Sequence, residues 1–239
     1  MSALRNWLIT AAALLGIALT VSLGFWQWGR GHQRDALQAA IEARKTATAL
    51  DGTALVATKN IADAVYRPVL LRGRWDAAHT VFLDNRQMDA KVGFYVVTPL
   101  LLDDSNRAVL VQRGWAPRNF EKREQLPPVE TPAGPVEVRG RLAPPPAKLY
   151  ELGAAGQGPI RQNLDIDAFA AETRLALLPL SVQQLGAPSE GLQRDWPTVA
   201  SGAAKNYGYA FQWWAMSGLI AILYVWFRFI APARRARRL

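Results

Sequence analysis

The polar side chains best suited to hold a ligand lie at the start of an apolar run near the C-terminus. The stretch KNYGYAFQWW, Lys205 to Trp214, opens a run from Asn206 to Phe227 that contains no charged residue. Tyr209, Gln212 and Trp213 recur every three to four residues, so they share one face of a helix. Aromatic residues also form belts at membrane interfaces. The stretch is therefore either an interfacial anchor or a binding site.

A second polar and aromatic group, Trp26-Gln27-Trp28, ends the first apolar run of the chain, just before Arg30. An unpaired amide inside a bilayer is costly, so Gln212 needs a partner. Gln27 is the predicted one, because antiparallel helices would place both amides at similar depth. The resulting cluster would either hold a flat ligand or simply join the two helices.

Motifs for catalysis and metal binding are missing from the sequence. There is no cysteine, which excludes disulfides and thiolate metal sites. His32 and His79 are the two histidines, and His79 reads as a surface or turn residue. No nucleophile is arranged with a base, so we expect neither an enzyme nor a metal site.

Two segments are long enough to cross a bilayer, which needs about 20 apolar residues. Residues 6–29 are 24 uncharged residues between Arg5 and Arg30, and residues 206–227 supply 22. The first ends in aromatic residues without a small-residue cleavage site, so it reads as an uncleaved anchor. Five arginines in the tail 228–239 predict a cytoplasmic C-terminus, and two spans then place the N-terminus in the cytoplasm as well. Residues 30–205 would form a domain on the other side of the membrane.

The charge distribution argues against a nucleic-acid partner. The formal net charge is +9, but all 19 acidic residues lie between Arg30 and Lys205 with 22 of the 28 basic ones, which leaves that segment at +3 (22 minus 19). The other basic residues flank the apolar runs, as expected for a protein in contact with membrane lipid.

The central segment predicts one α+β domain, mainly antiparallel. Residues 32–50 read as a short, weakly amphipathic helix, and alternating strands follow, as in YRPVLLRGRW and VEVRGRL. A helix over IDAFAAET would be capped by Asp165. Three strands place arginine beside glycine, in LLRGRW, LVQRGW and VEVRGRL. Such glycines indicate sheet curvature with solvated arginines, or else a basic sheet face that docks a partner.

An ordered set of motifs runs through most of the chain: LGFWQWGR, YRPVLLRGRW, LDNRQ, GFYVVTPL, VLVQRGWAP and YGYAFQWW. With the two-helix topology, this set resembles the surfeit locus protein 1 family, whose members assist assembly of haem-copper oxidases. The resemblance implies a bacterial inner membrane, with residues 30–205 in the periplasm. It also implies a role with cytochrome c oxidase subunit I and other assembly factors. The part played would be the delivery or retention of haem a. A haem-independent scaffold for oxidase intermediates is the alternative.

The resemblance also implies a haem site at the start of the second helix, where the family pattern places a histidine. Asn206 stands at that position here, and an amide oxygen is a poor ligand for haem iron compared with imidazole. One hypothesis is that His32 approaches Asn206, if the helices pack together, and acts as a substitute ligand; the alternative is an interfacial histidine beside Arg30 and Arg34. Arg30 would pair with a haem propionate or with a lipid phosphate. The predicted cofactor-binding set is Trp26, Gln27, Arg30, His32, Asn206, Tyr209, Gln212 and Trp213.

Overall fold

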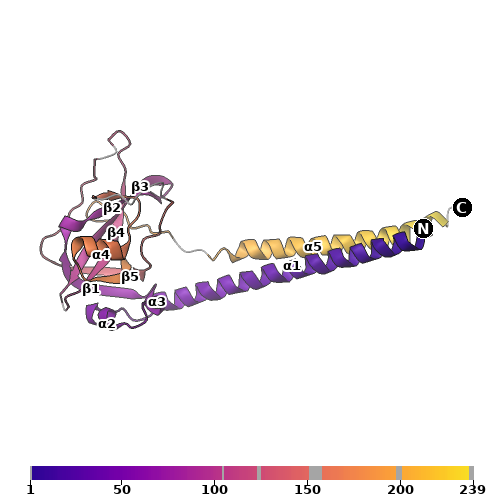
Figure 1. The fold of residues 1–239 in the computed structure, drawn as a ribbon, viewed down its shortest axis with the longest axis horizontal. Helices are drawn as coiled ribbons and strands as arrows, with labels where there is room; N and C mark the ends of the chain where they lie inside the picture. The colour runs from indigo at the N-terminus through magenta and orange to yellow at the C-terminus, as the bar shows by residue number, and fades with distance from the viewer. Residues whose placement is uncertain (1, 104, 123–124, 151–157, 198–200, 237–239) are drawn as a thin grey trace. The chain divides into compact units, whose positions relative to one another are not determined.

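The computed structural model describes residues 2–103, 105–122, 125–150, 158–197 and 201–236. These fall into two compact units, one of residues 1–40 and 199–239 and one of residues 41–198. Figure 1 shows the course of the chain. The helices and strands are α1 (Ser2–Lys45), α2 (Gly52–Ala57), α3 (Ile61–Ala64), β1 (Pro68–Trp75), β2 (Val81–Met88), β3 (Lys91–Leu102), β4 (Ala108–Pro117), β5 (Pro135–Ala143), β6 (Ile160–Arg161), α4 (Ile166–Thr173), β7 (Leu177–Gln184), α5 (Ala203–Val225), a π-helical turn (Trp226–Ile230) and α6 (Ala231–Ala236).

The first unit is a helix pair formed by α1 and α5, which lie side by side with both chain ends at the same end of the pair (Figure 1). Both helices are long and apolar enough to cross a membrane. Only 11 % and 6 % of the residues in their most apolar windows are buried, so they are not core helices of a soluble protein. The amphipathic helix predicted after Arg30 is not separate, because α1 continues to Lys45.

The second unit is built on a seven-stranded sheet of order β1-β5-β7-β4-β3-β2-β6. Its strand pairs are antiparallel except β4–β7 and β2–β6, which are parallel. The sheet is therefore mixed, within the predicted α+β class. Because β3 has 12 residues, its first half pairs with β2 and its last residues pair with β1. The pairing of β1 with both β5 and β3 closes β1, β5, β7, β4 and β3 into a barrel.

Buried apolar side chains alternate with exposed ones along the strands, as the sequence predicts, and the buried ones fill the barrel. In β1, Val69, Leu71 and Trp75 are buried while Arg72 and Arg74 are exposed. Side chains of all five barrel strands form one apolar cluster, with Leu71, Leu100, Val109, Val138 and Leu180 among its members. Helix α4 covers the outer face of β3 and β4 through Phe169. Its N-terminus is capped as predicted, since the Asp165 carboxylate accepts from the Ala168 amide.

The arginine-glycine strands owe their glycines to close backbone approaches. A Cβ atom at Gly73 would lie 2.1 Å from the Leu101 carbonyl oxygen, at the β1–β3 closure. At Gly140 it would lie 2.6 Å from Val182, and at Gly114 it would lie 2.6 Å from the Gln193 carbonyl oxygen. The curvature interpretation therefore explains the glycines at these three positions.

The prediction of solvated arginines is right for Arg72, Arg74 and Arg139 but wrong for Arg113, whose side chain is fully buried. The β3–β4 register shifts between Val96, opposite Gly114, and Val97, opposite Gln112. Arg113 is thus the extra residue of a β-bulge, which re-aims its side chain. Its guanidinium lies 4.7 Å from the centre of the Trp75 ring.

Two buried arginines share one carboxylate in this region. Glu190 Oε2 lies 3.0 Å from Arg113 Nη2 and 3.2 Å from Arg194 Nη2. Arg113 also donates to the Thr131 hydroxyl and the Glu130 carbonyl oxygen. Burial lowers the pKa of Arg194, an effect that Glu190 opposes. We name Arg113, Glu190 and Arg194 the buried arginine cluster.

Replacing Gly73 by alanine should destabilise the barrel. The added methyl group would meet the Leu101 backbone, and overpacking of this kind costs about 1–3 kcal/mol. Gly134→Ala is the matched control, because nothing lies within 4 Å of its Cβ position, and its effect should stay within about 0.5 kcal/mol. Chemical unfolding of the full chain in detergent measures both. Equal midpoints for the two variants would contradict closure of the barrel at Gly73.

Candidate functional site

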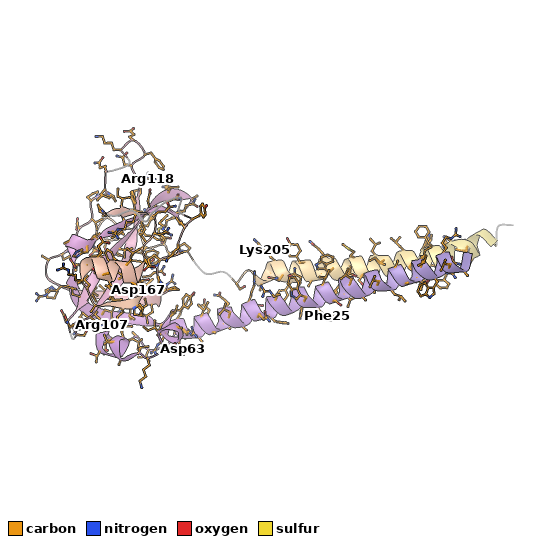
Figure 2. The ribbon with its side chains drawn as sticks, in the orientation of Figure 1. Phe25, Asp63, Arg107, Arg118, Asp167 and Lys205 are labelled. Atoms are coloured by element: carbon orange, nitrogen blue, oxygen red, sulfur yellow. The ribbon has the colours of Figure 1, made fainter. Side chains whose placement is uncertain are left out.

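The interface between α1 and α5 carries the candidate site, at the end where α5 begins (Figure 2 labels Lys205 in its first turn). Asn206 Nδ2 donates to Gln27 Oε1 across 2.7 Å. The position that the family pattern assigns to a histidine therefore holds an amide whose NH₂ group binds the facing helix.

Tyr207, the next residue of α5, contacts His32 and Asp35, which lie further along α1 than Gln27. Its hydroxyl donates to Asp35 Oδ2 at 2.7 Å and lies 3.3 Å from His32 Nδ1. The His32 ring also packs edge-on against Trp28, with ring centres 5.2 Å apart. The structure thus brings His32 to the start of α5, where its hydrogen-bond partner among the described residues is Tyr207 and not Asn206, and its Nδ1 atom faces the Tyr207 hydroxyl.

Aromatic rings of both helices contact one another at this level, with Tyr207 and Trp214 half-buried and Phe25 and Trp28 exposed. Trp28 lies 4.8 Å from Tyr207 and 5.7 Å from Trp214, measured between ring centres, and Phe25 lies 5.4 Å from Trp214. We name these four residues the aromatic interface. The two rings from α5 pack directly on glycines of α1. A Cβ atom at Gly24 would lie 2.1 Å from the Trp214 ring, and one at Gly31 would lie 2.5 Å from the Tyr207 ring.

The predicted site residues divide into two groups. Gln27 and Asn206 bond each other across the helix interface, and His32 contacts Tyr207 at its edge. The expected Gln27–Gln212 contact is wrong: Gln27 bonds Asn206, and Gln212 is exposed. The reason is the face on which each amide lies, because Gln212 is on an exposed face of α5 whereas Asn206 is half-buried against α1. The remaining predicted residues lie mostly outside the helix interface. Trp213 is half-buried, and Trp26, Arg30 and Tyr209 are exposed.

The residues that sequence reasoning missed follow a heptad pattern. Gly24 and Gly31 are seven residues apart on α1, as are Tyr207 and Trp214 on α5, and each glycine receives one ring. Ala210 and Ser217 continue the buried stripe on α5. A repeat of seven residues marks the contact seam of paired helices. This spacing of small and aromatic residues was the signal available in the sequence.

The donor groups at this level fit a haem only in part. Asn206 is not suited to axial ligation, since its side chain is an amide bound to Gln27. His32 fits better, because it is exposed and its Nδ1 is held by Tyr207, the type of outer partner that orients a ligating imidazole. Between the helices, the rings of Trp214 and Tyr207 pack directly on Gly24 and Gly31. A haem would therefore contact the outer surface of the helix pair.

Another histidine, His79, lies beside a separate cavity of about 290 Å³ in the barrel unit. Its Nδ1 is 2.7 Å from Asp76 Oδ2, in a short 3₁₀ turn, as the turn interpretation predicts. The neighbouring Arg161 pairs with Glu172 and lowers the pKa of that carboxyl. Both charged groups are thus already paired with protein partners, and we assign no catalytic role to them.

Losing the amide pair should weaken the helix contact measurably. Asn206→Leu and Gln27→Leu each leave one polar group unpaired, and such interhelical bonds are worth about 0.6 kcal/mol, up to about 1.7. The double variant should be more stable than the sum of the two single losses predicts. Gln212→Leu is the control and should have little effect, because Gln212 is exposed. Unfolding titrations in mixed detergent micelles measure all four, and additive losses would contradict the pairing.

Comparison with known proteins identifies the family of this chain. The model of the SURF1 family matches residues 14–218. A SURF1-like protein of Monosiga brevicollis is 24 % identical over 90 % of this chain and 86 % of its own length. Cytochrome oxidase assembly protein SHY1 of Saccharomyces cerevisiae is 30 % identical over 39 % of the chain, and a SURF1-like protein of Rickettsia felis is 29 % identical over 47 %. The matches to SHY1 and to an Arabidopsis thaliana relative span only 24 % and 29 % of those proteins.

The fold and the helix contacts define a class: a β-barrel domain inserted between two long apolar helices that pair through glycine and aromatic residues. The family match covers most of α1, the whole barrel unit and α5 as far as residue 218. The chain belongs to the SURF1 family.

Proposed function

We propose that this protein is a membrane-embedded, non-enzymatic assembly factor for a haem-copper cytochrome c oxidase. The observation that carries the proposal is the family match, which extends across the helix pair and the barrel unit. The relative named as a cytochrome oxidase assembly protein supports the direction of the assignment. The partners would be oxidase subunit I and other assembly factors.

The proposed placement is a bacterial inner membrane with both termini in the cytoplasm and the barrel unit in the periplasm. Arg228, Arg234, Arg235, Arg237 and Arg238 follow the apolar part of the second helix, and no acidic residue accompanies them. Basic residues next to a span favour the cytoplasmic side. The aromatic interface would then lie near the periplasmic surface of the inner membrane.

At that level we propose that His32 contacts haem a during its delivery to, or retention for, subunit I. The bound group would supply an iron centre, and His32 would hold it through its imidazole. Tyr207 orients the imidazole through Nδ1 and is itself held by Asp35. Arg30, exposed two residues earlier on α1, would attract the propionates.

A haem-independent scaffold is the second candidate, and one contact favours it. The Asn206–Gln27 hydrogen bond, together with the aromatic interface, joins the helices at the level where the family pattern places its histidine. In this alternative the same residues keep the helix pair rigid while the barrel unit contacts assembly intermediates.

Deletion of the gene tests the assembly function. In a strain without a second copy, reduced-minus-oxidised spectra of membranes should lose the haem a band, and oxidase activity should fall with it. Haem b in the same membranes serves as the internal control. Re-expression of the chain should restore both signals. Unchanged haem a content after deletion would overturn the proposal.

A further inference from the structure

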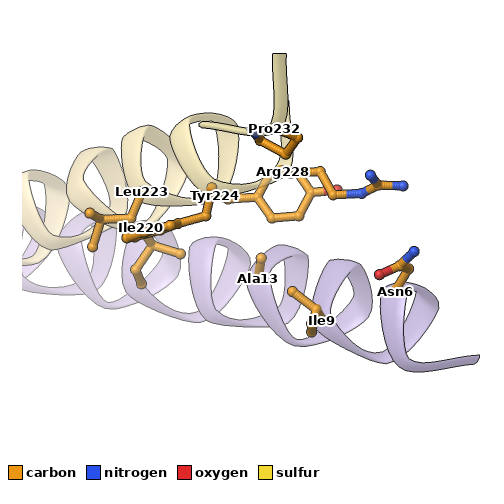
Figure 3. Close-up of a pocket in the computed structure, with 9 residues that line it drawn as sticks. Asn6, Ile9, Ala13, Ile220, Leu223, Tyr224, Arg228 and Pro232 are labelled. Carbon is orange, nitrogen blue, oxygen red and sulfur yellow. The ribbon is translucent and has the colours of Figure 1, made fainter. Parts of the chain in front are cut away.

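A groove lies between α1 and the end of α5, at the opposite end of the helix pair from the aromatic interface (Figure 3). Its volume is about 520 Å³, within the range of roughly 300–1,000 Å³ typical of small-molecule sites. Most of its surface is hydrocarbon. It is lined by Asn6, Ile9, Ala13, Ile220, Leu223, Tyr224, Phe227, Arg228 and Pro232.

The polar groups of this groove gather at one end. Figure 3 shows the Arg228 guanidinium and the Asn6 amide at the end nearer the N-terminus, with Ile220 and Leu223 at the other. The Tyr224 hydroxyl forms a 2.8 Å hydrogen bond with Thr10, which ties the two walls together. The groove therefore has a charged mouth and an apolar interior.

The local backbone explains the position of Arg228. A proline ring clashes with the carbonyl group four residues earlier in a regular α-helix, and for Pro232 that residue is Arg228. The helix widens here into a π turn, Trp226–Ile230, in which the Ala231 amide bonds the Trp226 carbonyl oxygen. Such π turns occur frequently at functional sites.

Within the helix-pair unit, no acidic side chain lies near the charge at the mouth. Asp35 is the sole acidic residue in residues 1–40 and 199–239, and it lies 29 residues from Asn6, about 43 Å along a helix. Arg5 and Arg234 add positive charge at the same end. An anion from outside the protein is thus the natural partner of Arg228.

We propose that the groove binds an anionic phospholipid. Its phosphate would pair with Arg228 and accept from the Asn6 amide, and one acyl chain would lie against Ile9, Ala13, Ile220 and Leu223. Because acyl chains fill any groove in a bilayer, the specific claim of this proposal is that the groove prefers a negatively charged headgroup. Basic pockets between membrane helices bind such headgroups. The inference rests on the membrane placement proposed above, but not on a role in oxidase assembly.

Lipid retention by the purified full-length protein tests this inference. Native mass spectrometry after equilibration with equal amounts of phosphatidylglycerol and phosphatidylcholine should show a roughly fivefold or greater preference for phosphatidylglycerol, given the attraction expected for one arginine. Arg228→Gln should abolish that preference. Arg5→Gln removes the same charge outside the groove lining and should preserve it.

A second pair of variants tests the groove without changing charge. Ala13→Leu fills the groove and should reduce the retained lipid, whereas Ala12→Leu adds the same side chain at an exposed position outside the lining and should not. Equal losses in Arg228→Gln and Arg5→Gln, or equal retention in both alanine variants, would overturn the site. Since lipid is counted on isolated protein, this outcome is independent of the deletion phenotype.

Discussion

Glu190→Gln should cost on the order of 3 kcal/mol of folding free energy, although it changes a single atom. Glu190 is the one carboxylate within ion-pair distance of both Arg113 and Arg194 among the described residues, and those side chains are 0 % and 3 % exposed. Breaking a buried ion pair by removing one partner typically costs 3–5 kcal/mol, since a buried charge loses its compensation. The lower end applies because glutamine keeps one acceptor oxygen.

The matched control is Glu137→Gln on the barrel surface. Glu137 pairs with Arg72, but the two side chains are 49 % and 73 % exposed, and such pairs contribute about 0–1 kcal/mol. Urea unfolding of the full chain in detergent, followed by tryptophan fluorescence, compares the two. The Arg113–Trp75 contact makes that signal sensitive to the cluster. Equal losses would show that the buried arginines are neutralised in another way.

The buried arginine cluster also marks a limit of sequence-based prediction. The motifs LLRGRW and LVQRGW look alike, yet Arg72 is exposed and Arg113 is buried. Alternation within each strand predicts which residues face the core, and it is right along β1 and β5. A β-bulge depends on the register with a partner strand, which no local pattern contains. The same holds for barrel closure, because β1 meets the end of β3 through a pairing of distant segments.

The helix pair was predictable in outline and not in its contacts. Uncharged runs of 24 and 22 residues fix two long helices by length alone. Depth reasoning paired Gln27 with the wrong amide because depth does not say which face of α5 turns toward α1, and Gln212 lies on an exposed face. The glycines carry the axial register, since Gly24 receives Trp214 and Gly31 receives Tyr207. That register sets Gln27 level with Phe211, so it does not by itself select Asn206 as the partner.

His32→Ala should remove most haem binding from the purified protein. Asn206 cannot substitute as a ligand, because its side chain is an amide bound to Gln27. His32 is the one histidine within residues 1–40 and 199–239, and it contacts Tyr207 in α5. A haem titration in detergent, read from the Soret band, should show affinity at least about tenfold lower than that of the unmodified protein. His79→Ala is the control and should bind normally, since His79 belongs to the barrel unit.

Tyr207→Phe separates ligation by His32 from mere proximity. The substitution keeps the ring that packs on Gly31 and removes the hydroxyl that holds His32 Nδ1. Loss of such an outer partner typically weakens metal affinity by about 10–100-fold. If His32 is the ligand, Tyr207→Phe should therefore lower haem affinity with little change in stability. Haem binding that is equal in the unmodified protein, His32→Ala and Tyr207→Phe would remove the ligand assignment, and no Soret band in any of them would favour the scaffold function.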